Sequence, residues 1–336
     1  MNAIDAQGLR LTYADGTEAV RGIDLTVPRG EFFGFLGPNG AGKTTTIKVL
    51  ATLLRPTGGS VSVNGFDVTD DPRKIRQSIG YMRQETTIDP ELTARENIRF
   101  ACEAYGVPRG ERDERIDELL DLVDLADVGD KKSEGFSGGM KKRLDAATAL
   151  VHRPPLVFLD EPTTGLDPKA RNRLWDYFRK INDQGTTILL TTQYLEEADQ
   201  LCDRISVIND GELVATGSPA ELKREVGGEI LEIELEDGAD ASERAAELAR
   251  SSGRFDEAAA VEVTDTGLAV TSRDAREVGT DFLVDLRDAG LTVTGFNIRA
   301  PTLDDVFLAI TGESVDADGA GDGSTAEAET ASEVPR

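Results

Sequence analysis

The chain is poor in cysteine, histidine and aromatic residues, and it has no long apolar segment. Its 336 residues include two cysteines and one histidine, and 5% are aromatic. Two distant cysteines cannot form a disulfide framework, and a single histidine argues against a zinc site. The apolar runs have the length of buried strands, short of the ~20 residues that cross a bilayer. The first ten residues also lack signal-peptide features, so we expect a soluble protein of a reducing compartment.

Basic residues are scarce relative to acidic ones. Lys and Arg total 37 against 63 Asp and Glu, which gives a formal net charge of −26. This balance argues against a surface that binds nucleic-acid backbones, although it permits a small basic pocket for one nucleotide. The acidity is typical of proteins from a salt-rich cytoplasm. Because 39% of the residues are apolar, we expect a globular chain, with about two domains at roughly 150 residues each.

Up to residue 226, short apolar runs alternate with polar helical stretches. This pattern is typical of an α/β fold with buried strands. Two charge-rich helices predicted at Thr93–Tyr105 and Glu111–Leu125 interrupt the pattern, so we expect a helical subdomain at about residues 90–150. An Asn64-Gly65 turn predicts a hairpin.

The pattern changes after Gly227-Gly228, which marks a domain boundary. Residues 229–311 follow the order strand, helix, strand, strand, helix, strand. This order predicts a small α+β, ferredoxin-like domain. The tail, residues 312–336, is acidic and rich in small residues, a composition that predicts disorder.

A glycine-rich segment lies between the predicted strand Phe32–Leu36 and a helix predicted at Gly42–Leu54. It fits G-x-x-x-x-G-K-[ST] and contains Gly37, Pro38, Asn39, Gly40, Ala41, Gly42, Lys43, Thr44 and Thr45. The backbone N–H groups of such a loop and of the following helix attract an anion. Lys43 adds a full charge for the β- and γ-phosphates, and the Thr44 hydroxyl can ligate Mg²⁺. This segment, the phosphate loop, predicts nucleotide binding; the alternative is a turn that merely ends a strand.

A second apolar run, Leu156–Leu159, ends in two adjacent carboxylates, the pattern of a Walker B segment. Because successive residues at a strand end point in different directions, the two acids can take different roles. We expect Asp160 to hold Mg²⁺ and Glu161 to polarise the attacking water as general base. The alternative is a solvated acidic turn, which is common in so acidic a chain.

The order of the motifs resembles the nucleotide-binding domain of ATP-binding-cassette (ABC) proteins over roughly residues 5–225. Gln84 after a predicted strand, the segment Phe136–Arg143 and Asp167 after the carboxylates complete the series. Three stretches are more similar to ATPase subunits of daunorubicin-resistance-type drug exporters, namely Phe136–Arg143, Thr191–Ala198 and Pro301–Phe307. The resemblance implies a P-loop ABC ATPase domain with a helical subdomain.

The resemblance also implies roles for individual residues. Tyr13 would stack on adenine, and Gln84 would contact Mg²⁺ or water and sense a permease. Asp167 would lie across a dimer interface. The signature segment, defined as Ser137, Gly138 and Gly139, would contact the γ-phosphate of ATP bound to a second copy. The alternatives are an ordinary strand aromatic for Tyr13, a polar loop residue for Gln84, a helix cap for Asp167 and a helix-initiating turn for the signature segment.

Two positions depart from the family pattern. Met140 stands where the family more often has glutamine, and this leaves the signature segment intact. Gln193 stands where most members carry a switch histidine; its amide donates a hydrogen bond but cannot carry a proton's charge. The drug-exporter subunits share this glutamine, which indicates a working variant. His152 lies just before the Walker B strand, and we expect a surface or loop histidine there.

The sequence and the resemblance together predict an ATPase that binds ATP and Mg²⁺ between two head-to-tail copies. The dimer would dock on a separate membrane permease, through the surface around Gln84 and Thr93–Leu125, at the cytoplasmic face of the membrane. The implied cargo is a drug or another hydrophobic compound, with a lipid or an ion as alternatives. Pro301–Phe307 would pack on the ATPase domain or regulate dimer opening.

Two further functions compete with this prediction. A soluble ABC ATPase acting on nucleic acid or ribosomes is opposed by the net charge and by the single cassette. A binding module that uses ATP only as a dimerisation switch is opposed by the presence of Glu161.

Overall fold

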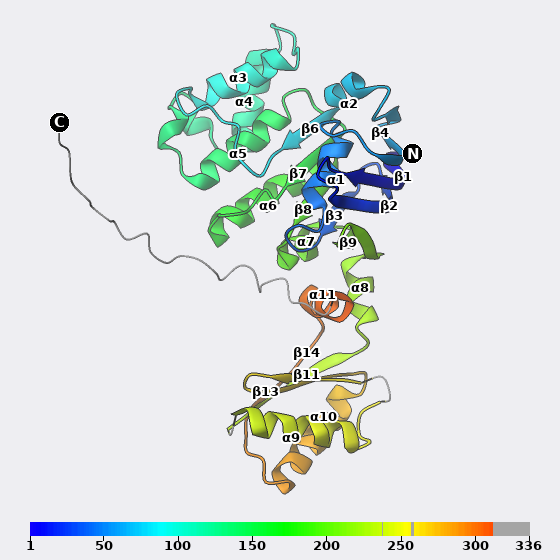
Figure 1. Cartoon of the computed structure of the whole chain (residues 1–336). Helices are drawn as coiled ribbons and strands as arrows, with labels where there is room; N and C mark the ends of the chain where they lie inside the picture. The colour runs from blue at the N-terminus through cyan, green and yellow to red at the C-terminus, as the bar shows by residue number, and fades with distance from the viewer. Residues whose placement is uncertain (237, 257–258, 312–336) are drawn as a thin grey trace, which may run out of the picture.

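Three β-sheets and their covering helices make up the part of the chain that the structure describes. The structure is a computed structural model and describes residues 1–236, 238–256 and 259–311 (Figure 1). Within these ranges, no helix has both the length and the apolar character needed to cross a membrane. The predicted disordered tail, residues 312–336, lies outside the described residues.

The first sheet is antiparallel, with strand order β2-β1-β4-β5. Its strands are β1 (Asn2–Thr12), β2 (Glu18–Pro28), β4 (Gly58–Val63) and β5 (Phe66–Asp67). Both turn residues between β4 and β5, Asn64 and Gly65, have positive φ, at 53° and 83°. A two-residue hairpin turn of this kind needs that conformation, so the predicted hairpin is confirmed.

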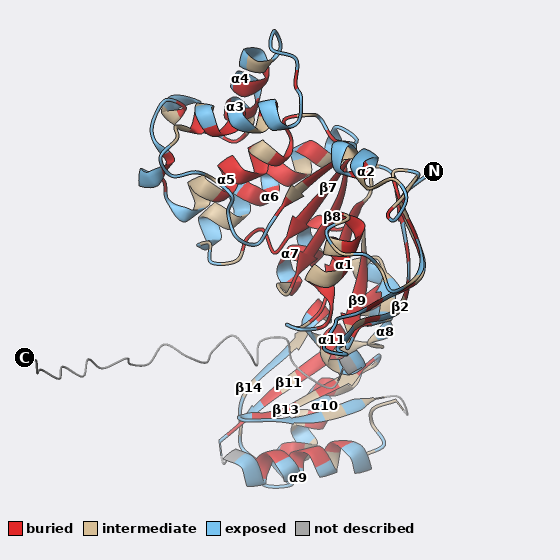
Figure 2. Cartoon of the chain, turned by 45° about the horizontal axis from the view of Figure 1, so that its top comes forward, coloured by how far each residue is buried: buried red, intermediate tan, exposed pale blue. Residues whose placement is uncertain are grey.

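The second sheet has six strands, in the order β10-β9-β3-β8-β7-β6. Its strands are β3 (Phe32–Leu36), β6 (Ile79–Met82), β7 (Leu156–Asp160), β8 (Thr187–Thr192), β9 (Arg204–Asn209) and β10 (Glu212–Gly217). All residues of β3, β7 and β8 are buried, as Figure 2 shows in red. Strands β6, β7, β8, β3 and β9 run parallel, so their carboxyl ends share one edge.

Helices cover this sheet, and one of them is shorter than predicted. They are α1 (Lys43–Leu50), α2 (Pro72–Ser78), α6 (Pro168–Asp183), α7 (Leu195–Leu201) and α8 (Pro219–Glu225). The sequence predicted that the first helix would reach Leu54, but it ends at Leu50. Thr52 adopts a left-handed φ of 60°, and the N–H groups of Leu53 and Leu54 turn back to the carbonyl of Lys48. Such a turn satisfies the last carbonyls and ends the helix.

The helical subdomain lies at one end of the six-stranded sheet (Figure 1). It consists of α3 (Ala94–Ala104), α4 (Arg112–Leu122), α5 (Gly138–Ala149) and the short 3₁₀ turns η1 (Ala126–Val128) and η2 (Ser133–Gly135). Thr93 and Glu96 form a reciprocal capping box at the start of α3. Ile98, Ile116 and Leu144 belong to the same core cluster as the sheet, so the subdomain packs on it directly.

The segment after residue 228 folds as a separate sheet with two helices on one face (Figure 2). It contains β11 (Glu229–Leu235), α9 (Gly238–Ser251), β12 (Ala260–Thr264), β13 (Gly267–Ser272), α10 (Ala275–Asp288) and β14 (Val293–Arg299). The antiparallel order β12-β13-β11-β14 puts β13 between β11 and β12, and β11 between β13 and β14. This is the predicted ferredoxin-like arrangement of two split βαβ units.

The last described helix, α11 (Leu303–Thr311), returns to the part of the chain before residue 226 and contacts α7 and α8. Its apolar residues Leu303, Val306 and Phe307 are buried in the core cluster of that part. Arg299 anchors the turn before it with bonds to Glu232 (2.6 Å) and Asp305 (2.6 and 2.9 Å). Packing on the ATPase domain, one of the two roles predicted for Pro301–Phe307, is therefore what the structure shows.

We expect Phe307→Ala to destabilise the ATPase core by about 3–5 kcal/mol, because it removes a large buried side chain. Phe307 is 2% exposed, whereas Phe296 on β14 is 59% exposed. Phe296→Ala is the matched control and should change stability by no more than about 0.5 kcal/mol. Urea unfolding followed through the fluorescence of Trp175, a buried member of the same cluster, measures both. Equal midpoints for the two variants would show that α11 does not support this core.

Candidate nucleotide-binding site

The predicted site residues meet at the carboxyl edge of the parallel strands. The phosphate loop follows β3, and the carboxylate pair ends β7. Leu36 at the end of β3 pairs with Thr192 at the end of β8, and Gln193 follows Thr192 directly. Gln84 lies two residues beyond β6. Open α/β sheets bind ligands at this edge, because the loops there converge.

Glycine is required at two positions of the phosphate loop because other backbone lies very close. A Cβ added to Gly37 would lie 2.3 Å from the carbonyl oxygen of Ile208. A Cβ added to Gly42 would lie 2.4 Å from the carbonyl oxygen of Ala19, and the φ of Gly42 is +104°. The spacing of the motif thus follows from how the loop fits between β2 and β9.

The Lys43 side chain is buried, at 4% exposure, and its ammonium lies inside the loop. Nζ donates to the carbonyl oxygens of Gly37 (2.6 Å) and Pro38 (2.9 Å) and lies 3.8 Å from Oε1 of Glu161. Burial lowers the pKa of Lys43, and attraction to Glu161 and Asp160 opposes that shift. A buried cation inside a ring of backbone groups fits the phosphates of a nucleotide.

Three hydroxyl groups surround the Asp160 carboxylate. Oδ1 accepts hydrogen bonds from Thr44 (3.0 Å) and Thr191 (2.7 Å), and Oδ2 accepts one from Tyr81 (3.3 Å). Burial raises the pKa of Tyr81, so its phenol stays protonated and donates. A carboxylate beside a threonine hydroxyl is the oxygen donor set that Mg²⁺ uses together with phosphate oxygens. Within residues 1–236, 238–256 and 259–311, no three His, Cys, Asp or Glu side chains form a cluster that could hold a metal ion.

Glu161 lies beside Gln84 in the structure. Nε2 of Gln84 donates to Oε2 of Glu161 at 3.0 Å, and the Thr164 hydroxyl lies 3.4 Å from the same oxygen. Glu161 has a left-handed φ of 47°, which is uncommon for a residue with a side chain. Its N–H donates to the carbonyl oxygen of Thr191 at 3.0 Å, which holds this strained backbone in place.

Tyr13 lies beside the phosphate loop, although it is far from it in the sequence. Its hydroxyl is 2.9 Å from the Thr45 hydroxyl, and its ring is 38% exposed. An exposed ring held next to the loop is available to stack on a base.

The signature segment and Asp167 lie together, at a second place on the same chain. The Ser137 hydroxyl caps α5 by accepting from the N–H of Met140 (3.3 Å), and Asp167 caps α6 by accepting from that of Ala170 (2.9 Å). Residues of both segments line one cavity of about 200 Å³, whose lining consists of Ser137, Gly139, Met140, Arg143, Asp167, Lys169, Ala170 and Arg173. Among these described lining residues none belongs to the phosphate loop. Asp167 therefore caps α6, which was the alternative interpretation. A capping residue can also lie at a dimer interface, so the two interpretations are compatible.

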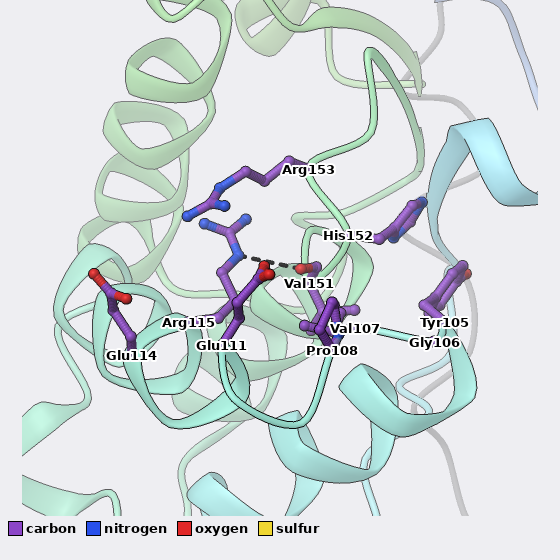
Figure 3. A pocket seen from close by; sticks show the side chains of 10 residues that line it. All are labelled: Tyr105, Gly106, Val107, Pro108, Glu111, Glu114, Arg115, Val151, His152 and Arg153. Carbon is purple, nitrogen blue, oxygen red and sulfur yellow. Dashed lines mark hydrogen bonds between the residues drawn. The ribbon is translucent and has the colours of Figure 1, made fainter.

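His152 lies away from these residues, in the loop between α5 and β7. Its ring stacks on Tyr105, with centroids 4.0 Å apart, and Nε2 lies 3.0 Å from the carbonyl oxygen of Ile79. Burial lowers the pKa of His152 to about 4, so the ring is neutral at neutral pH. Both rings border a cavity of about 500 Å³ into which Arg115 and Arg153 project (Figure 3). The expected loop position is correct, and the ring is half-buried.

Sequence reasoning missed the residues that support the predicted ones. Thr191 and Tyr81 hold Asp160, and two buried charged residues of α5, Lys142 and Asp145, hold the segment that contains Gln84. Thr191 had a sequence signal, because two adjacent threonines end the apolar run before Gln193. The spacing of three residues between Lys142 and Asp145 was a signal for that pair, because it places both on one helix face.

Comparisons with known proteins agree with this geometry. A family model described as ABC transporter matches residues 20–164, and one described as the C-terminal domain of DrrA1-3-like ATP-binding proteins matches residues 217–311. The chain is 44% identical over 318 residues to the daunorubicin/doxorubicin resistance ATP-binding protein DrrA of Streptomyces peucetius, covering 94% of each chain. It is 33% identical to the linearmycin resistance ATP-binding protein LnrL of Bacillus subtilis, covering 93% of this chain and 99% of that one.

Solved structures show the same fold. An ATP-binding subunit of an ABC transporter superposes with a TM-score of 0.61 at 32% identity, covering 67% of this chain and 93% of that one. The ATP-binding cassette MJ0796, a dimer bound to ADP and phosphate, gives 0.59 at 28% identity, covering 64% of this chain and 98% of that one. With the phosphate loop, the carboxylate pair and the DrrA-like C-terminal domain all in place, the chain belongs to the ABC transporter family as an ATP-hydrolysing exporter subunit.

Proposed function

We propose that this ATPase powers export of a drug or another hydrophobic compound, as a dimer on a separate membrane permease. The contact of Gln84 with Glu161, beside the buried Lys43, carries the ATPase part of this proposal. The class of cargo is supported by relatives named for daunorubicin, doxorubicin and linearmycin resistance. A relative named for Nod factor export supports export as the direction of transport.

The roles proposed for individual residues follow from their positions. Lys43 and the loop N–H groups bind the β- and γ-phosphates, and Tyr13 stacks on the adenine. Thr44, Asp160 and Gln84 would hold Mg²⁺, which when bound neutralises charge on the phosphates. Glu161 accepts the proton of the attacking water, and Gln84 orients its carboxylate through the 3.0 Å bond. Gln193, at the end of β8, donates an amide hydrogen bond toward the γ-phosphate.

The dimer is supported by the separation of the two halves of the site. The signature segment borders a cavity that contains no phosphate-loop residue among its described lining. Pairing two copies head to tail by a twofold axis brings the Ser137 hydroxyl and the first N–H groups of α5 to the partner's nucleotide. Asp167, next to the signature segment, would then lie at the interface.

The permease would dock in a groove between the sheet and the helical subdomain. This cavity, of about 650 Å³, is lined by Ala51, Leu53, Arg73, Arg76, Gln77, Ile79, Tyr81, Ala104, Tyr105 and Gly106. Exposed Leu53 (53%) and Tyr105 (41%) offer an apolar floor, and two arginines border it. A short amphipathic segment with acidic side chains fits this chemistry. Such docking would place the subunit at the cytoplasmic face of the membrane.

We also propose a division of the chain into domains. Residues 1–226 would form the nucleotide-binding domain, with the helical subdomain at about 90–150, and residues 229–311 the C-terminal domain. Because α11 is buried in the core of the first domain, the C-terminal domain is tied to it at both ends.

Replacing the proposed base should separate binding from hydrolysis. Glu161→Gln keeps the shape and the contact with Gln84 but cannot accept a proton, so turnover should fall about 10²–10⁴-fold. Equilibrium dialysis should show ATP still bound, whereas Lys43→Ala should lose tight binding. Near-normal phosphate release by Glu161→Gln would remove this residue from the role of base.

The departure at residue 193 can be tested directly. Gln193→His restores the switch residue of most family members, and we expect turnover within a few-fold of the wild type, because Glu161 and Gln84 do not depend on it. Steady-state phosphate release measures the effect. A rise of about tenfold or more would show that the glutamine restrains hydrolysis and that proton transfer at this position limits the rate.

A further inference from the structure

Two buried charged side chains of α5 hold the segment that follows β6. Lys142 is 9% exposed, and its Nζ donates a short hydrogen bond to the backbone carbonyl oxygen of Gln84. Asp145 is 3% exposed, and its Oδ1 accepts from the backbone N–H (3.2 Å) and the hydroxyl (2.6 Å) of Thr87. Lys142 and Asp145 are three residues apart and share one helix face, so they contact both ends of the Gln84–Thr87 segment.

This arrangement is costly in free energy, which argues that it serves more than packing. Burial lowers the pKa of Lys142 and raises the pKa of Asp145, so each charge is held against a desolvation penalty. Within the described residues, Oδ2 of Asp145 is buried and has no hydrogen-bond partner. Apolar side chains of similar size would hold a helix against the sheet at lower cost.

Successive turns of α5 contact different parts of the proposed mechanism. Its first turn carries the signature segment, and Ser137 caps that turn. One turn further along, Lys142 contacts the main chain of Gln84, whose side chain donates to Glu161 at 3.0 Å. The Lys142 ammonium is also attracted to Asp160 and Glu161. A displacement of α5 is therefore transmitted to the residue that orients the proposed base.

We propose that Lys142 and Asp145 are positioning residues that make α5 and the Gln84–Thr87 segment move as one body. When the signature segment meets ATP held by the partner copy, α5 is fixed, and Gln84 in the same chain is thereby fixed against Glu161. The state of one ATP site thus sets the geometry of the other. This inference rests on the proposed dimer and deepens it.

The primary test is Lys142→Met in the full-length chain. This change keeps the length of the side chain and removes the bond to Gln84. Because a buried hydrogen bond to a charged group is lost, kcat should fall about tenfold or more. ATP affinity by dialysis should stay within about twofold, because the phosphate loop is untouched, and Lys142→Arg should restore most of kcat. Lys180→Met, on the exposed side of α6, is the matched control and should leave kcat unchanged.

A purely structural role is distinguished by combining Lys142→Met with Gln84→Ala. If Lys142 acts through Gln84, the second substitution should add little further loss of kcat, because interacting residues are not additive. If the losses multiply, the inference is wrong.

Asp145→Asn gives an independent test should Lys142→Met fail to fold. It keeps the size of the side chain but removes the charge that strengthens both hydrogen bonds from Thr87, so kcat should fall while ATP affinity is retained. Wild-type kcat in either folded variant, or a fall in ATP affinity that accounts for the loss, would overturn the inference. Glu161→Gln is run in the same assay. If it loses turnover while both α5 variants keep theirs, the ATPase proposal stands and this inference fails.

Discussion

The nucleotide site depends on a balance of buried charges at the carboxyl edge of the six-stranded sheet. The Lys43 ammonium lies among loop carbonyls and 3.8 Å from Glu161, and hydroxyl groups of three different strands or loops hold Asp160. Neither the cation nor the carboxylates could stay buried without these partners. The parallel strands fix the partners, and neighbouring backbone lies so close to Gly37 and Gly42 that a side chain at either position would collide with it.

Much of this site was predictable because its residues lie in short segments with local rules. The phosphate loop, the carboxylate pair after an apolar strand and the βαββαβ order of the second domain were all read from the sequence. The end of α1 was not, since it depends on the left-handed turn at Thr52. Tyr81, Lys142 and Asp145 were also missed, because their importance comes from packing between distant segments. The spacing of Lys142 and Asp145 places both on one helix face, but it does not show which face of so charged a helix is buried.

We propose that the same chain carries two incomplete halves of a hydrolytic site and a means of connecting them. In the proposed dimer, the phosphate loop and the carboxylates form one half, and the signature segment beside Asp167, which borders a separate cavity, forms the other. Between them, α5 contacts Gln84 through Lys142 and Thr87 through Asp145. The C-terminal domain contributes α11 to the core of the ATPase domain, where it packs on α7, the helix that follows Gln193. The helices α5, α7 and α11 therefore pack into one core cluster, while α1, which follows the phosphate loop, packs into a second cluster.

The central claim is that ATP is enclosed between two copies of this chain. The most direct measurement is sedimentation velocity of the Glu161→Gln variant with and without ATP and Mg²⁺. We expect a monomer without nucleotide, a dimer with it, and no dimer when Ser137 is replaced by a bulky residue. A variant that stays monomeric under saturating ATP, while the wild-type monomer hydrolyses ATP at a rate independent of protein concentration, would contradict the claim.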